Sequence, residues 1–194
     1  SSDLRFFTNL FKNVVESNLM NCLKTLNLKN TNIRADETQI LFDFLKTDPA
    51  IQNLDVSYNY IEFGEVDEKF TSVMEVNTHL ESINLKRNTL STATQLTFAT
   101  AISKSTSIKN ICLYACGFTT LPTIALLDSL KEGVVEKIDL RCNQINNLYK
   151  SRTLIATLKK LFMRSCVKLL DLRINLLKCG RGLHKLYTKL EKVK

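Results

Sequence analysis

The sequence predicts an α/β solenoid in which every unit is a strand, a turn and a helix. Three observations lead to this prediction. An 11-residue apolar pattern occurs six times, at intervals of 28, 29, 28, 27 and 32 residues. Apolar residues at helical spacing follow the copies, and amphipathic segments flank the array at both ends. Stacked units of this kind bury one continuous core, so we expect about six parallel strands on one side and helices on the other.

The six copies begin at Leu23, Ile51, Leu80, Ile108, Val135 and Val167. Each has apolar residues at positions 1, 4, 6 and 11, and positions 4 and 6 alternate like the inward residues of a strand. Position 9 is occupied by Thr31, Asn59, Asn88, Cys116, Asn143 and Asn175. A small hydrogen-bonding side chain is expected there, because the chain turns out of the strand and leaves buried backbone groups to be satisfied.

A helix is predicted after each strand. Apolar residues recur at position 20 and again three residues later, on one helical face; they are Phe42, Phe70, Ala99 and Leu127, then Leu45, Val73, Ile102 and Leu130. The longer fifth interval predicts an extended helix with Leu154, Leu158, Leu161 and Phe162 as its inner stripe. We expect one domain over residues 1–194, with an N-terminal helical cap in 1–22, six repeats in 23–180 and a C-terminal capping helix in 181–194.

The pattern matches LxxLxLxxNxL, the signature of leucine-rich repeats, and its period of about 28 residues resembles the ribonuclease-inhibitor-like class. This resemblance implies a partial horseshoe, with a concave parallel sheet, convex helices and a role in binding other proteins. Helices of that class commonly contain glycines that are missing here. Short arrays of this kind also resemble effectors of intracellular bacterial pathogens, which implies the host-cell cytosol.

Composition constrains the setting. The six cysteines are interpreted as reduced, because the repeats supply a core without disulfides, and this favours a cytoplasmic protein. There is no run of 18 or more apolar residues, so no membrane span is predicted. The net charge of +8 is unevenly distributed, since residues 150–194 hold 13 Lys and Arg against 2 Asp and Glu.

No enzyme is predicted, and no cofactor or metal site. The two histidines, His79 and His184, have no partner in the sequence pattern that would make either a catalytic base. Cys112 and Cys116 lack a second ligand pair for zinc, and no glycine-rich phosphate loop occurs. Cys112 and Cys142 are interpreted as inert thiols.

The predicted partner-binding surface lies on the concave face. Outward-facing positions 5, 7, 8 and 10 of the repeats place polar and aromatic side chains in columns across the sheet. The candidates are Asn27, Lys29, Asp55, Ser57, Tyr58, Tyr60, Asn84, Lys86, Arg87, Tyr114, Asp139, Arg141, Asp171 and Arg173. Tyrosine and arginine dominate the energetics of protein interfaces, although Asp139 with Arg141 and Asp171 with Arg173 can equally satisfy one another.

The predicted partner is therefore another protein, and an enzyme whose active-site cleft would be covered is one candidate. The chain is expected to be monomeric when unbound. Two alternatives stay open: binding of nucleic acid or an acidic partner through the basic C-terminal third, and a regulatory scaffold resembling the repeat domain of a GTPase activator. Nucleic acid is the less favoured partner, because aromatics are not interleaved among those lysines.

Overall fold

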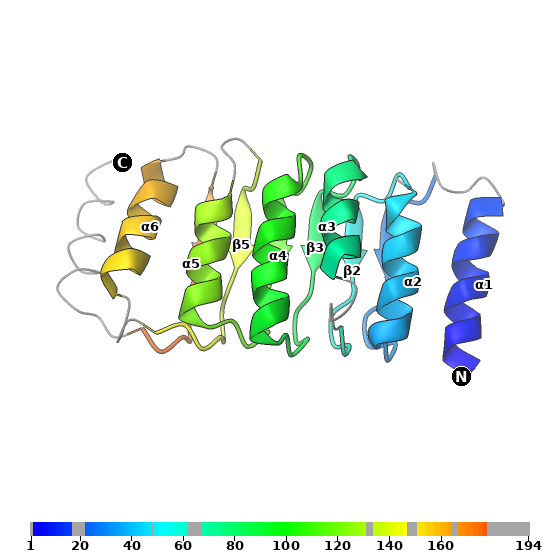
Figure 1. Ribbon diagram of the computed structural model, residues 1–194, viewed down its shortest axis with the longest axis horizontal. Coiled ribbons are helices and arrows are strands. Elements are labelled where there is room, and N and C mark those ends of the chain that lie inside the picture. Colours follow the sequence, from blue (N-terminus) through cyan, green and yellow to red (C-terminus); the bar gives the residue numbers. More distant parts are fainter. Residues whose placement is uncertain are drawn as a thin grey trace.

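The computed structural model describes residues 2–16, 22–47, 49–61, 67–130, 134–146, 151–163 and 167–177. Strands and helices alternate along this part of the chain (Figure 1). The strands are β1 Thr25–Asn27, β2 Asn53–Asp55, β3 Ser82–Asn84, β4 Asn110–Cys112, β5 Lys137–Asp139 and β6 Leu169–Asp171. The helices are α1 Ser2–Glu16, α2 Ala35–Lys46, α3 Asp67–Val76, α4 Thr92–Lys104, α5 Thr120–Ser129 and α6 Ser151–Met163.

The strands form one parallel sheet in the order β1-β2-β3-β4-β5-β6, as the α/β solenoid prediction requires. Position 4 of every repeat is in register with position 4 of the next, beginning with Leu26 beside Leu54 and ending with Ile138 beside Leu170. Figure 1 shows the helices side by side in front of the strands. We call the opposite surface, which the helices leave uncovered, the open sheet face.

The core lies between the strands and the helices. Positions 4 and 6 of the first five repeats are buried together with the predicted helical residues, including Phe42, Phe70, Leu154 and Leu158. Phenylalanine rings run through this core from unit to unit: the ring centroids of Phe42 and Phe70 are 5.0 Å apart, and those of Phe70 and Phe98 are 5.7 Å apart. The prediction for Phe162 is wrong, because its side chain is 38% exposed on the outer side of α6.

The ends of the array are described unequally. Helix α1 packs beside α2, where Phe11 stacks on Phe44 with ring centroids 4.5 Å apart. The predicted C-terminal capping helix, residues 181–194, lies outside the described residues. In the described part of the chain, no helix has the length and apolar character needed to cross a membrane.

Asparagine side chains at position 9 hydrogen-bond backbone groups, as predicted, and they also connect consecutive repeats. Asn143 accepts hydrogen bonds at Oδ1 from the backbone N–H groups of Cys116 and Phe118 in the preceding repeat. Its Nδ2 donates to the carbonyls of Leu113 in that repeat and Leu140 in its own. Asn59, Asn88 and Asn175 repeat this pattern, so each amide satisfies backbone groups of two units at once.

Repeat 4 has Cys116 in place of the asparagine. Its thiol donates to the carbonyl of Leu85 at 3.0 Å, which confirms that this cysteine replaces an amide, and burial raises the pKa of the thiol to about 12. A thiol cannot replace both the hydrogen-bond donor and the hydrogen-bond acceptor of an amide. The N–H groups of Asn88 and Leu90, from which an amide there would accept hydrogen bonds, donate instead to the carbonyls of Leu85 and Cys116. Gln95, which is 2% exposed, adds contacts between the two repeats by donating to the carbonyls of Leu90 and Gly117 and accepting from the N–H of Thr119.

Position 8 turns the chain out of the strand in every repeat. All six residues there have left-handed backbones, with φ between 53° and 57°: Asn30, Tyr58, Arg87, Ala115, Cys142 and Ile174. Glycine or asparagine would adopt this conformation most easily, and only one of the six residues is of either type. The turn is therefore imposed by the hydrogen bonds on both sides of it, and it sets the direction of the position-8 side chain.

Candidate functional site: the open sheet face

The candidate residues divide into those with a structural role and those without one. Side chains at position 5 belong largely to the first group. Asn27, Asp55, Asn84, Asp139 and Asp171 each accept a hydrogen bond at Oδ1 from the backbone N–H of position 7, at 2.9 to 3.1 Å. These contacts fix the end of each strand. The acidic and amide column is thus explained by the fold, which the sequence pattern did not indicate.

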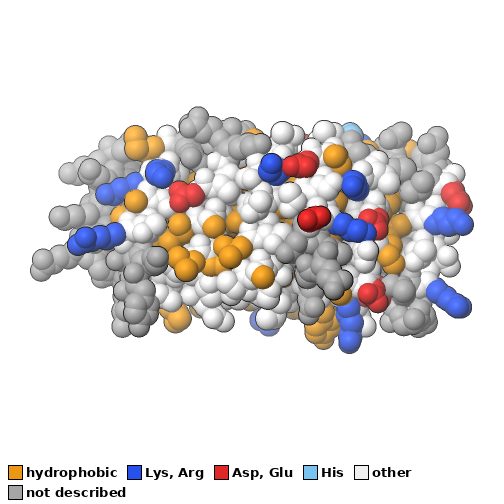
Figure 2. All heavy atoms as spheres, in the orientation of Figure 1, with side chains coloured by type: hydrophobic (Ala, Val, Ile, Leu, Met, Phe, Trp, Pro, Cys, Tyr) orange, Lys and Arg blue, Asp and Glu red, His pale blue; other side chains and the backbone are white. Residues whose placement is uncertain are grey.

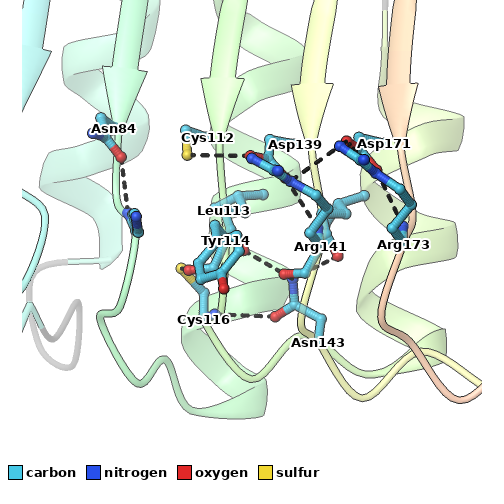
Figure 3. A network of polar contacts seen from close by, with 12 residues as sticks. Asn84, Cys112, Leu113, Tyr114, Cys116, Asp139, Arg141, Asn143, Asp171 and Arg173 are labelled. Carbon is cyan, nitrogen blue, oxygen red and sulfur yellow. Dashed lines mark hydrogen bonds and ion pairs between the residues drawn. The ribbon is translucent and has the colours of Figure 1, made fainter.

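The two arginines nearest the C-terminal end of the sheet are paired within the face (Figure 3). Arg141 contacts Asp139 at 2.6 Å and reaches Asp171 at 3.4 Å, while Arg173 contacts Asp171 at 2.7 Å. Hydrogen bonds from Arg173 lower the pKa of Asp171. Partial burial alone would raise the pKa of Asp139, but hydrogen bonds from Arg141 outweigh it and the pKa is lowered. The predicted mutual pairing is confirmed.

A second group of side chains forms a continuous row that we call the basic-aromatic seam: Lys29, Tyr58, Lys86, Arg87 and Tyr114. The cationic groups of Lys29, Lys86 and Arg87 lie 5.2, 5.5 and 5.7 Å from the centroid of the Tyr58 ring. Lys86 also lies 4.8 Å from the Tyr114 ring, and Arg141 approaches that ring at 5.3 Å. Cation–π contacts of this kind hold long basic side chains at defined places on the sheet.

The seam covers Ser57. Lys29 and Lys86 occupy position 7 on either side of Ser57, and both reach toward the Tyr58 ring. Ser57 is consequently 1% exposed. Its prediction as an exposed contact residue is wrong. Alternation along a strand predicts which way a side chain points, but it does not predict whether larger neighbouring side chains cover it.

An open pocket of about 370 Å³ lies beside the seam, where the chain leaves β1 to β4. Its walls come from positions 8 to 10 of the first four repeats: Asn30, Tyr58, Asn59, Tyr60, Arg87, Thr89 and Ala115. Tyr60 is 62% exposed, and the guanidinium of Arg34 lies 5.6 Å from its ring. Asn30, Thr89 and Arg34 were missed as site residues, although the common left-handed turn at position 8 would have placed the first of them at this edge.

Two thiols, Cys112 and Cys116, have raised pKa values, which is the opposite of the shift that activates a cysteine nucleophile. Burial raises the pKa of Cys112, whose Sγ lies 3.9 Å from a carboxylate oxygen of Asp139. A hydrogen bond with the Cys142 side chain raises the pKa of Tyr114. His79 precedes β3 and so lies at the opposite end of the strands from the pocket. Among the described residues, no group of three or more His, Cys, Asp and Glu could hold a metal ion.

The helical face differs from the open sheet face. It carries both signs of charge, with exposed hydrophobic side chains over α4 and α5 (Figure 2). Leu96 and Leu121 contribute to this exposure. In the basic C-terminal third, Lys160 and Lys168 pair with Asp128 and Glu136 at 3.8 and 2.9 Å. The remaining lysines from 178 onward lie outside the described residues.

Repeat length, strand order, register and the asparagine contacts together fit a leucine-rich-repeat solenoid. Comparison with known proteins gives no family model that matches this chain and no matching curated protein. Among solved structures, the tropomodulin C-terminal domain from the structural genomics of Caenorhabditis elegans is 12% identical. The structural match covers 92% of each of the two chains and has a TM-score of 0.44. The fold assignment therefore rests on the geometry of the repeats themselves.

Proposed function

We propose that this chain is a non-enzymatic recognition module that binds a partner protein on the open sheet face. The observation that carries the proposal is the basic-aromatic seam with its adjoining pocket. Tyrosine and arginine are the residue types that dominate interface energetics, and here they are held in place by neighbouring side chains. A preordered surface loses little side-chain entropy on binding.

Finer features of the proposal come from the sequence. The ribonuclease-inhibitor-like resemblance suggests a partner whose active site is covered, and inhibition would follow from that coverage. A regulatory scaffold resembling a GTPase-activator repeat domain would use the same face without inhibition. We further propose that the unbound chain is a monomer and that it works in a cytoplasmic compartment, which is the host cytosol if it is a pathogen effector.

Site-directed photocrosslinking tests the proposal. A photoreactive phenylalanine derivative replaces Tyr60 on the open sheet face in one variant and Leu121 on the helical face in the other. Both side chains are exposed, at 62% and 55%, so the two probes are matched for access to solvent. After illumination in extracts of the source cells, we expect a discrete crosslinked protein from position 60 and none from position 121. Crosslinks from position 121 alone, or equally from both, would refute the assignment of the face.

A further inference from the structure

The open sheet face has two halves of different charge character. In the half made by repeats 5 and 6, Arg141 and Arg173 are neutralised by Asp139 and Asp171 at 2.6 and 2.7 Å. In the half made by repeats 1 to 4, the cations of the seam are Lys29, Lys86 and Arg87. Within the part of the chain that the structure describes, none of these three forms an ion pair with a carboxylate.

The carboxylate nearest to them in the sequence pattern is already engaged. Asp55 accepts a hydrogen bond at Oδ1 from the backbone N–H of Ser57, at 2.9 Å. Its Oδ2 accepts another from the side-chain amide of Asn84, at 3.0 Å. The three cations instead converge on the Tyr58 ring, which holds them together despite their like charge. Like charges held side by side favour a negatively charged ligand.

We infer that the basic-aromatic seam binds an acidic segment of the partner protein, with carboxylates of that segment placed on Lys29 and Lys86 and a third anionic group reaching Arg87 at the pocket. This inference rests on the proposed function and specifies the chemistry of its partner. Charge complementarity is the reason for choosing an acidic partner. It would also speed association and select which segments bind.

A protein carboxylate suits this surface better than a nucleic acid. Bases bind single-strand sites by stacking on free aromatic faces, but here the Tyr58 and Tyr114 rings are already approached by three and two cations. Asp55 stands in the neighbouring column, and Arg141 and Arg173, which a continuous phosphate backbone would follow across repeats 5 and 6, are already paired with carboxylates. A segment with a few well-spaced carboxylates avoids both conflicts.

The spacing of the cations gives the spacing of the acidic groups. Lys29 follows β1 and Lys86 follows β3, so they are two strands apart. Neighbouring strands are about 4.8 Å apart, so the backbones of Lys29 and Lys86 are about 10 Å apart. Their ammonium groups lie 5.2 and 5.5 Å from one ring centroid, so they are no farther apart than about that distance. In a helix, residues seven apart are separated by about 10.5 Å and lie on one face. A helical segment with two glutamates seven residues apart therefore matches the seam.

The test is a titration of the full ¹⁵N-labelled chain with 16-residue helical peptides, followed by amide chemical shifts. The first peptide has glutamates at its positions 5 and 12 in an alanine and glutamine background, and the matched peptide has glutamine at both. We expect only the glutamate peptide to shift the amides of Lys29, Tyr58, Lys86, Arg87 and Tyr114. Equal shifts from both peptides, or shifts confined to other residues, would overturn the inference.

Variants assign the effect to the seam. Lys29→Gln with Lys86→Gln removes both charges while keeping part of each aliphatic stem, and we expect it to weaken binding of the glutamate peptide at least about tenfold. Lys86→Arg should retain binding. Arg173→Gln, whose charge is already paired, should bind as the parent does. The Lys-to-Gln variant must show the parent circular-dichroism spectrum, and unchanged binding by that folded variant contradicts the inference.

A 12-residue oligothymidylate in the same titration distinguishes the other class of anion. Larger amide chemical-shift changes in the seam residues with this oligonucleotide than with the glutamate peptide would also overturn the inference, in favour of nucleic acid. The crosslinking experiment separates this inference from the proposed function. A crosslink at position 60 without peptide binding leaves a protein-binding face whose partner is not acidic, whereas failure of both removes the face itself.

Discussion

The position-9 amide of repeat 5 provides the sharpest test of how the array is held together. Replacing Asn143 with alanine removes the partner of three backbone groups: the N–H of Cys116, the N–H of Phe118 and the carbonyl of Leu113. A fourth group, the carbonyl of Leu140, keeps a hydrogen bond from Asn175 at 2.8 Å. Each buried group left without a partner costs about 1 to 1.5 kcal/mol, so Asn143→Ala should lower the free energy of unfolding by about 3 to 5 kcal/mol.

Asn175→Ala is the matched control, because it removes the same amide from the last described repeat. The carbonyl of Leu140 then still accepts a hydrogen bond from Asn143, and the N–H of Ile145 is the main group left without a partner. The expected loss is about 1 to 2 kcal/mol. Urea unfolding followed by circular dichroism measures both values, and amide hydrogen exchange at Phe118 locates the first effect. A loss for Asn143→Ala no larger than that for Asn175→Ala would refute this account of the amides.

Three further predictions concern the turn, the core and the paired arginines. Ala115→Gly relieves a left-handed alanine at φ 53° and should raise the free energy of unfolding by about 0.5 to 1 kcal/mol. The control Ala156→Gly, on the exposed side of α6, should lower it by about 1 kcal/mol. If the thermal melting temperatures of the two variants shift in the same direction, the backbone at Ala115 is not strained. Phe70→Ala, at 0% exposed, should cost about 3 to 5 kcal/mol in urea unfolding, and a loss under about 2 kcal/mol would show that its ring contacts matter little. The pKa values of Asp139 and Asp171 are lowered in the folded chain, so their stabilisation is present above the unfolded pKa of about 3.9 and is lost as pH falls through the folded values. Asp139→Asn with Asp171→Asn should flatten the stability profile of the parent below pH 4, and an unchanged profile would show that the pairs do not contribute.

Much of the fold could be predicted from the sequence because its determinants recur. Leu54, Ile83 and Ile111 must all point into one core, so their spacing fixes strand, direction and register together. The hydrogen-bonding role of position 9 was equally predictable, since a turn leaves backbone groups unpaired wherever it occurs. Cys116 could be recognised as a replacement for asparagine because it stands at that position.

The open sheet face was less predictable, because it depends on contacts between repeats that periodicity does not encode. Alternation correctly placed Lys29 and Lys86 outward, but it could not show that they would close over Ser57 with the Tyr58 ring. Asp55 was assigned to partner binding, whereas one of its oxygens holds the end of its own strand. Gln95 occupies a helix position at which no other repeat has a glutamine, so the repeat pattern could not predict its contacts with Leu90, Gly117 and Thr119.

The substitution of Cys116 for asparagine has a mechanical consequence. Between repeats 3 and 4, the usual amide contacts give way to one thiol hydrogen bond, a backbone hydrogen bond from Leu90 to Cys116 and the contacts of the Gln95 side chain. A stacked array unfolds by separating neighbours, so its resistance to stretching is that of its weakest junction. Removing the side chain of Gln95 should therefore lower the force at which repeats 3 and 4 separate.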